Sequence, residues 1–171
     1  DRDGDGFGDL SQDACPTDAV RQTACPVAPP ARAAVVSRVS QSASRWREGK
    51  ALAVLSRRAR KLPVGTTFRF TLDKAATARF AFKLRKAGRR VGGRCRTPSR
   101  RNKGKRPCVR SLAAGSRSFS NAHAGANRVR FAGRLSRKKK LHPGNYTLTI
   151  TATNGPGLVS VPKRLNFTIV K

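Results

Sequence analysis

Apolar and polar side chains alternate along several short stretches of the chain. In residues 67–72 the sequence TFRFTL places Phe68, Phe70 and Leu72 at every second position, with Thr or Arg between them. A period of two is the period of a strand that buries one face. Residues 76–86, ATARFAFKLRK, repeat this pattern with two further Phe residues. Both segments are predicted to be strands.

The same kind of pattern predicts the rest of a β-sheet protein. An apolar run starts the region and three alternating segments follow later, at residues 34–39, 127–135, 146–152 and 165–169. About seven short strands without a convincing long helix are typical of an antiparallel β-sandwich, which we expect over residues 34–171. Residues 50–61, KALAVLSRRARK, fit a short helix or a strand equally well. Trp46, the only Trp, is expected to pack in the core.

A segment in the middle of the chain, residues 85–106, is strongly basic. Residues 85–106 contain eleven Lys and Arg and almost no large apolar side chain. Such a segment is expected to be a loop or a hairpin tip, and without a cross-link it would be disordered. A bridge between Cys95 and Cys108 would close it, which the chain-entropy model values at about 3 kcal/mol.

Charge is distributed very unevenly. The chain carries 38 Lys and Arg against 8 Asp and Glu, a net charge of +30. Residues 1–18 hold six Asp against one Arg, and no acid follows Asp73. The 98 residues after Asp73 therefore cannot supply a pair of carboxylates, and their two His, His123 and His142, have no acidic neighbour in sequence. We expect a protein that is not an enzyme.

The acidic opening, DRDGDGFGDLSQDACPTD, predicts a calcium loop. Closely spaced carboxylates repel one another, and a hard divalent cation with oxygen ligands relieves that repulsion. Calcium sites of modest affinity suit the outside of a cell. The alternative is a solvated acidic linker.

Four Cys permit three disulfide connectivities, of which we favour the two local ones, Cys15 with Cys25 and Cys95 with Cys108. A zinc site is the competitor, but zinc ribbons place two to four residues between the Cys of each half, far fewer than here. Disulfides form in oxidising compartments, which again indicates an extracellular or cell-surface location.

Prolines mark the boundary between the two parts. Pro26, Pro29 and Pro30 favour extended backbone, so the predicted organisation is a calcium-binding repeat at residues 1–27, a linker at 28–33 and the sandwich at 34–171. No stretch approaches the roughly 18 apolar residues of a transmembrane helix. No initiator Met or signal peptide opens the sequence, and we expect the acidic repeat to connect to an upstream domain.

The acidic segment resembles the thrombospondin type 3 repeat, an extracellular calcium repeat of the form DxDxDGxxDxxDxCP, with one residue inserted after Asp9. The resemblance implies that Asp1, Asp3, Asp5 and Asp9 bind calcium through their side chains and Phe7 through its carbonyl oxygen. Compared with an EF-hand loop, position 12 is Gln12 instead of Glu, so Asp13 is expected to be the closing ligand.

The end of the chain resembles bacterial immunoglobulin-like and fibronectin type III-like domains. The matching residues are LHPGNYTLTITATNGPG at 141–157 and VSVPKRLNFTIV at 159–170, the last two strands of such a domain. The resemblance implies an immunoglobulin-like sandwich in which the hydroxyl of Tyr146 caps a neighbouring loop. A plain core aromatic is the alternative for this residue.

The basic charge indicates binding to polyanions such as teichoic acids or acidic glycans, with nucleic acid bound only nonspecifically. The candidate residues are Arg94, Arg96, Arg100, Arg101, Lys103, Lys105, Arg106, Lys138, Lys139 and Lys140. The alternative is that the charge merely reflects an Arg-rich composition. We expect a secreted, calcium-stabilised, noncatalytic module for cell-envelope structure or adhesion; the alternatives are a dedicated polyanion-binding domain and an accessory domain of a larger secreted enzyme.

Overall fold

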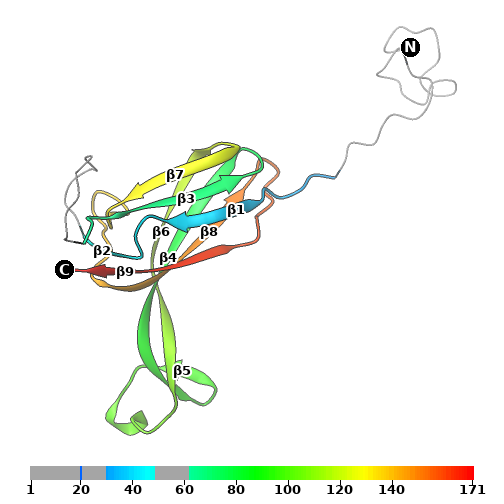
Figure 1. Cartoon of the computed structure of the whole chain (residues 1–171). Coiled ribbons are helices and arrows are strands. Elements are labelled where there is room, and N and C mark those ends of the chain that lie inside the picture. Colours follow the sequence, from blue (N-terminus) through cyan, green and yellow to red (C-terminus); the bar gives the residue numbers. More distant parts are fainter. Residues whose placement is uncertain (1–19, 21–29, 49–61) are drawn as a thin grey trace, which may run out of the picture. The chain divides into compact units, whose positions relative to one another are not determined.

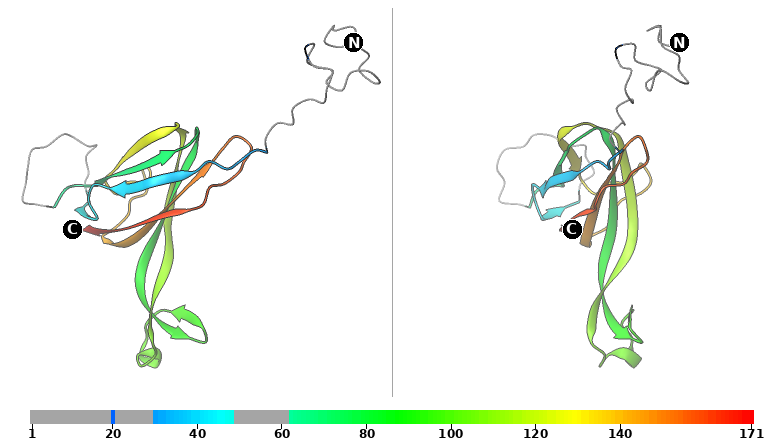
Figure 2. Two further views of the ribbon diagram at one scale, coloured as in Figure 1. Left: turned by 45° about the vertical axis from the view of Figure 1, so that its right-hand side comes forward. Right: turned by 90° about the vertical axis from the view of Figure 1, so that its right-hand side faces the viewer.

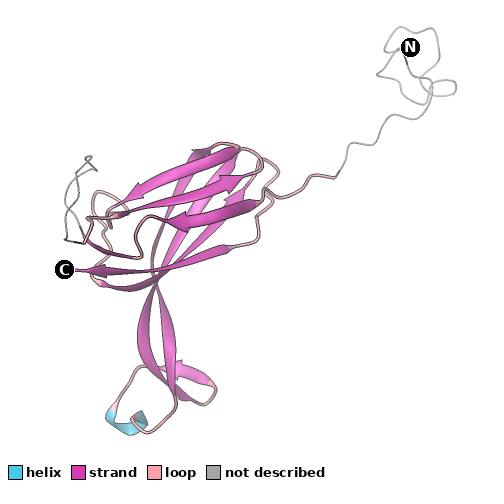
Figure 3. Ribbon diagram, viewed as in Figure 1, coloured by secondary structure: helices cyan, strands magenta, loops and turns pink. Residues whose placement is uncertain are grey.

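The computed structural model describes residues 20, 30–48 and 62–171 of the chain. The chain divides into two units, Asp1–Ala31 and Arg32–Lys171. The second unit contains all nine strands of the described residues, together with one short 3-10 helix and no α-helix (Figure 3). The prediction of a mainly β protein is therefore confirmed.

One sheet has three antiparallel strands, β1 (Val36–Gln41), β3 (Thr66–Leu72) and β7 (Gly125–Phe131), with β3 in the middle. The apolar positions of β3 are buried and its Arg69 is exposed, as the alternation predicts. Arg69 lies directly opposite Arg128 of β7, so the outer face of this sheet carries unopposed positive charge.

The second sheet has six strands. They are β2 (Arg45–Arg47), β9 (Lys163–Val170), β8 (Gly144–Thr153), β4 (Ala76–Val91), β5 (Arg94–Arg96) and β6 (Pro107–Ala122), where β4 pairs with β8, β5 and β6. β2 pairs with β9 in parallel, so this sheet is mixed and the prediction of a wholly antiparallel sandwich is wrong at this edge. Three residues around Trp46 form β2, too short a run to show a period.

Aromatic rings from the two sheets meet in one core. Phe131 of β7 stacks on Phe82 of β4 with ring centroids 4.9 Å apart, and Phe68 of β3 contacts Phe80 of β4 at 5.9 Å. Trp46 is fully buried and stacks on Phe167 of β9 at 5.6 Å. Aromatic pairs at such distances add to the apolar area that they bury. The two sheets therefore pack face to face around a single core (Figure 1).

Tyr146 fastens the turn before β8 to the core. Its ring stacks on Phe167, and its hydroxyl donates a hydrogen bond of 2.7 Å to the carbonyl oxygen of His142. Burial raises the pKa of the Tyr146 hydroxyl above its ordinary value of 10.0, with the hydrogen bond acting in the opposite direction and the charge of Glu48 adding a smaller rise.

The segment expected to be a loop or a hairpin tip belongs to a hairpin, and its residues 85–91 and 94–96 are strand. β4 continues to Val91 and β6 begins at Pro107, so residues 85–106 are the outer half of a long hairpin together with its tip. β6 itself was not predicted. The whole length of β6 pairs with β4, and these backbone hydrogen bonds do not depend on an apolar alternation.

Candidate polyanion-binding arm

The hairpin of β4 and β6 extends beyond the sandwich. The last residue of β4 that pairs with β8 is Arg85, opposite Asn145, and from there outward β4 pairs with β5 and β6 alone. We call residues 86–110 the basic arm. Two further views agree that it leaves the sandwich as a separate twisted ribbon (Figure 2). At about 3.3 Å per residue, Val91 lies roughly 20 Å from Arg85.

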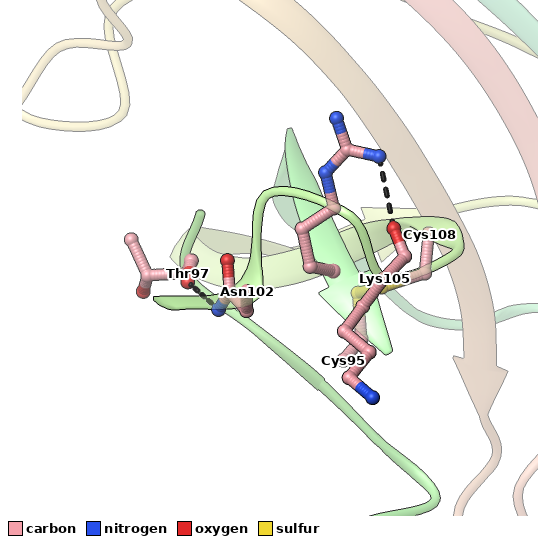
Figure 4. Close-up of a disulfide and its surroundings, with 6 residues drawn as sticks. Cys95, Thr97, Asn102, Lys105 and Cys108 are labelled. Carbon is pink, nitrogen blue, oxygen red and sulfur yellow. Dashed lines mark hydrogen bonds between the residues drawn. A yellow bond between two sulfur atoms is a disulfide. The ribbon is translucent and has the colours of Figure 1, made fainter. Parts of the chain in front are cut away.

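A disulfide closes the tip of the arm. Cys95 of β5 bonds to Cys108 of β6 with Cα atoms 5.9 Å apart, which confirms that predicted pair (Figure 4). The bridge joins the short strand that turns back along β4 to the strand that returns to the sandwich. It therefore fixes the two sides of the loop at residues 97–106 relative to each other.

Hydrogen bonds order the loop that the disulfide closes. Asn102 accepts from the backbone N–H of Ser99 at 2.8 Å and donates to the carbonyl oxygen of Thr97 at 2.9 Å. Arg89 donates to the carbonyl oxygen of Lys105 at 2.9 Å, and both side-chain bonds to carbonyl oxygens are drawn in Figure 4. The 3-10 helix η1 (Arg100–Asn102) forms within this loop. The tip therefore has a defined conformation, held by these hydrogen bonds and the disulfide, despite its high positive charge.

Gly88 allows the arm to close tightly. A Cβ atom at Gly88 would lie 2.5 Å from the sulfur of Cys95 and 2.8 Å from Cγ of Arg110. Because both distances are shorter than real carbon contacts, only glycine fits under the disulfide and the Arg110 stem. The side chain of Arg110 is therefore placed by packing on the arm itself.

The arm is basic throughout. It contains eleven Lys and Arg in 25 residues and no Asp or Glu. Nine of the eleven are exposed, and Arg89 and Arg110 are half-buried. Two like-charged pairs lie directly opposite each other across the strands, Lys86 with Arg110 and Arg89 with Arg96. Like charges in such positions destabilise a hairpin, and a bound anion would remove that cost.

The acids of the described residues are engaged elsewhere. Glu48 forms an ion pair with Lys140 at 3.5 Å, and Asp73 accepts a hydrogen bond of 2.7 Å from the backbone N–H of Val35. These are the two acidic residues in the second unit. The positive charge of the arm is therefore not neutralised by the part of the chain that the structure describes.

The second predicted basic group lies on the sandwich, beside the inner half of β6. Lys138, Lys139 and Lys140 are exposed on the loop after β7. Leu135 lies in the same loop and anchors it, since its carbonyl oxygen accepts from Arg117 of β6 at 2.8 Å. Lys139 crosses β6 at Gly115, where a Cβ would lie 3.2 Å from its Cε.

The structure therefore does not unite the two predicted basic groups in one patch. The strand between Gly115 and Pro107 spans about 26 Å, which separates the Lys loop from the tip. Lys140 is also partly neutralised by Glu48. The predicted residues between Arg94 and Arg106 do lie together, on the outer end of the arm.

Sequence reasoning missed four bases of the arm: Lys86, Arg89, Arg90 and Arg110. The signal that could have found them was the absence of acids from Lys74 to the end of the chain, which leaves every base of the hairpin without a partner.

The predicted calcium ligands Asp1, Asp3, Asp5, Phe7, Asp9 and Asp13, and the predicted pair Cys15 and Cys25, lie outside the described residues. Within the described residues, no group of three or more His, Cys, Asp and Glu could hold a metal ion. In the same part of the chain, no helix has the length and apolar character needed to cross a membrane.

No family model and no curated protein sequence matches the chain. The proposed function therefore rests on the basic arm and its charges.

Proposed function

We propose that the chain is a noncatalytic binding module that attaches to anionic polymers through the basic arm. The observation that carries the proposal is the eleven Lys and Arg, with no acid, on a hairpin that projects from the sandwich and is closed by a disulfide. A polymer with repeated negative charges would release its counterions on such a surface, which favours binding at low salt.

The composition of the arm favours an acidic glycan or a phosphate polymer over nucleic acid. Residues 86–110 contain no Phe, Tyr or Trp. Eight of the nine described aromatic residues are buried, and the ninth, Phe119, is half-buried beneath Arg117 on β6. Proteins that bind single strands stack bases on exposed aromatic rings, and these are lacking on the arm.

The rest of the proposal follows from the sequence. A disulfide in the arm supports secretion, because such bonds persist in oxidising compartments. The acidic opening would bind calcium and connect the module to further domains, and the sandwich would be of the immunoglobulin-like class. Attachment to acidic polymers of a cell envelope would then serve envelope structure or adhesion, for this chain or for a larger secreted protein that contains it.

The test is salt-titrated binding of the full chain to a panel of immobilised polymers. The panel contains heparin, teichoic acid, duplex DNA and uncharged dextran. We expect retention on heparin or teichoic acid that falls steeply between about 50 and 200 mM salt, and no retention on dextran. Equal, weak and salt-independent binding to all four would refute the proposal.

A further inference from the structure

Four polar side chains form a regular patch on the outer face of the six-stranded sheet. Asn145 and Thr147 of β8 lie directly opposite Thr168 and Asn166 of β9. The residue between the two positions of each strand is buried, so all four side chains lie on the solvent side of the sheet. At about 4.8 Å between strands and about 3.3 Å per residue, they cover an area of roughly 5 by 7 Å. We call these four residues the Asn–Thr patch.

Two cross-strand hydrogen bonds orient the amides of the patch. The hydroxyl of Thr147 donates to the side-chain oxygen of Asn166 at 2.7 Å. In the same way, the hydroxyl of Thr168 donates to the side-chain oxygen of Asn145 at 2.8 Å. Neither amide NH₂ group makes a hydrogen bond within the described residues. The patch therefore presents two oriented donors, and the Thr oxygens keep lone pairs that can accept.

Bases border the patch on two sides. On one side, Lys83 and Arg85 of β4 lie opposite Thr147 and Asn145. On the other side, Arg45 of β2 pairs with Thr168. The three basic side chains are exposed, and none forms an ion pair or a side-chain hydrogen bond within the described part of the chain. Neutral hydrogen-bonding groups are thus flanked by free cations.

The patch is continuous with one face of the basic arm. Arg85 is the last residue of β4 that pairs with β8, so the arm begins beside the patch. Arg89 lies four residues further along β4 on the same side of the strand, and Arg96 of β5 lies opposite it. At about 3.3 Å per residue, Arg89 is roughly 13 Å from Arg85. A polymer of several units on this face of the arm therefore reaches the patch.

We infer that the Asn–Thr patch binds one hydroxyl-bearing sugar unit of an acidic glycan, an inference that rests on the proposed function. The hydroxyls of a sugar both donate and accept, so they match the amide donors and the Thr oxygens. A carboxylate or sulfate of the same polymer then pairs with Lys83 or Arg85. The oxygens of a polyphosphate chain only accept, and they leave the Thr oxygens without a donor. The patch should therefore favour a glycan over a polyphosphate of similar charge.

The experiment measures the affinity of the full chain for a heparin oligosaccharide and for polyphosphate of similar charge at several salt concentrations. The test variant carries Asn145→Ala and Asn166→Ala, which removes both amides and no charge. We expect heparin binding to weaken about tenfold at every salt concentration, the scale of two hydrogen bonds between neutral groups. The slope of log K against log salt should stay unchanged, because no cation is lost. Polyphosphate binding should change less than about twofold.

A matched control and a second variant accompany the first. The control, Thr149→Ala with Thr151→Ala, removes two neutral side chains from the same face of β8, opposite Ala81 and Arg79. It should change the affinity for heparin less than about twofold. The second variant, Thr147→Val with Thr168→Val, keeps the strands β-branched and both amides in place but removes the hydroxyls that orient them. It should weaken heparin binding by a similar factor of about ten.

The outcomes separate this inference from the proposed function. If both patch variants bind heparin as well as the control does, the patch has no role and the inference is wrong, while binding through the arm stands. An equal loss of polyphosphate binding would also overturn it, because the patch would then bind anions without regard to sugar hydroxyls. If the wild type binds no polymer of the panel, the proposed function fails and this inference fails with it. The midpoint of thermal unfolding is measured first for each variant, so that a misfolded sheet is not mistaken for any of these results.

Discussion

The salt dependence of binding should depend on the tip of the arm. The perturbation replaces Arg100, Arg101, Lys103, Lys105 and Arg106 by Gln. All five side chains are exposed, and none forms a hydrogen bond or ion pair within the described part of the chain. The folded structure should therefore tolerate the change, with a midpoint of thermal unfolding close to that of the wild type.

The magnitude follows from counting charges. Each base that contacts a flexible polyanion contributes about 0.7 to the slope of log K against log salt, so the eleven bases of the arm give at most a slope of about −8. Removing five should reduce the magnitude of that slope by about 3.5. Between about 50 and 200 mM salt, the variant should then lose roughly a hundredfold less affinity than the wild type.

The control removes the same charge from the sandwich. Arg69, Arg128, Arg130, Lys163 and Arg164 are exposed on the two sheets and lie outside the arm. At physiological salt, charges more than about 8 Å from the polymer are largely screened. Replacing these five by Gln should change the slope by less than about 1.

Affinity chromatography on heparin, or fluorescence titration with a heparin oligosaccharide at several salt concentrations, measures the slope. An unchanged slope in the tip variant would refute the reasoning, and so would an equal decrease in the control. Either result would mean that the whole basic surface acts as a diffuse charge and that the projection of the arm has no role.

Three further predictions concern the Cys95–Cys108 disulfide, Tyr146 in the core and the acidic segment at the start of the sequence. Replacing Cys95 and Cys108 by Ser should destabilise the closed conformation of the tip by about 3 kcal/mol, so trypsin should cut the arm about a hundredfold faster at its Lys and Arg residues. An unchanged cutting rate would show that the disulfide does not order the tip. Burial raises the pKa of Tyr146, so above pH 10.0 the folded state keeps a proton that the unfolded state loses, and the free energy of unfolding should fall as the pH rises further. Tyr146→Phe should flatten that fall. An identical pH profile in the variant would contradict the assignment. Replacing Asp3 and Asp5 by Asn should weaken calcium binding by at least about tenfold in calorimetry of the full chain, whereas unchanged heat of binding would show that these carboxylates are not ligands.

Where an apolar face had to be buried, the sequence was sufficient to predict the strands. The alternation around Phe68 and Phe80 marks β3 and the inner half of β4, because a strand between two packed sheets must turn one face inward. β6 escaped prediction for the opposite reason. Its inner positions include Gly115 and Arg117, and it is held mainly by backbone pairing with β4. The parallel pairing of β2 with β9 is a tertiary event that no local pattern encodes.

Only some features of the basic arm could be predicted from the sequence. The basic run and the nearby Cys pair predicted a stapled, charged tip. The opposition of Lys86 to Arg110 could not be predicted, because it depends on the register of β4 against β6 and on a bulge between Phe82 and Lys83. The order of the tip loop also depends on hydrogen bonds of Asn102 to the backbone of Ser99 and Thr97, which have no signature in composition.

The measurement that tests the central claim most directly is a map of where a polyanion touches the protein. Amide signals of the isotope-labelled full chain are followed by NMR during titration with a heparin oligosaccharide at physiological salt. The account predicts that the largest changes fall in residues 86–110, with smaller ones at the loop of Lys138 and Lys139. Changes spread over the outer faces of the two sheets, with the arm unaffected, would contradict it.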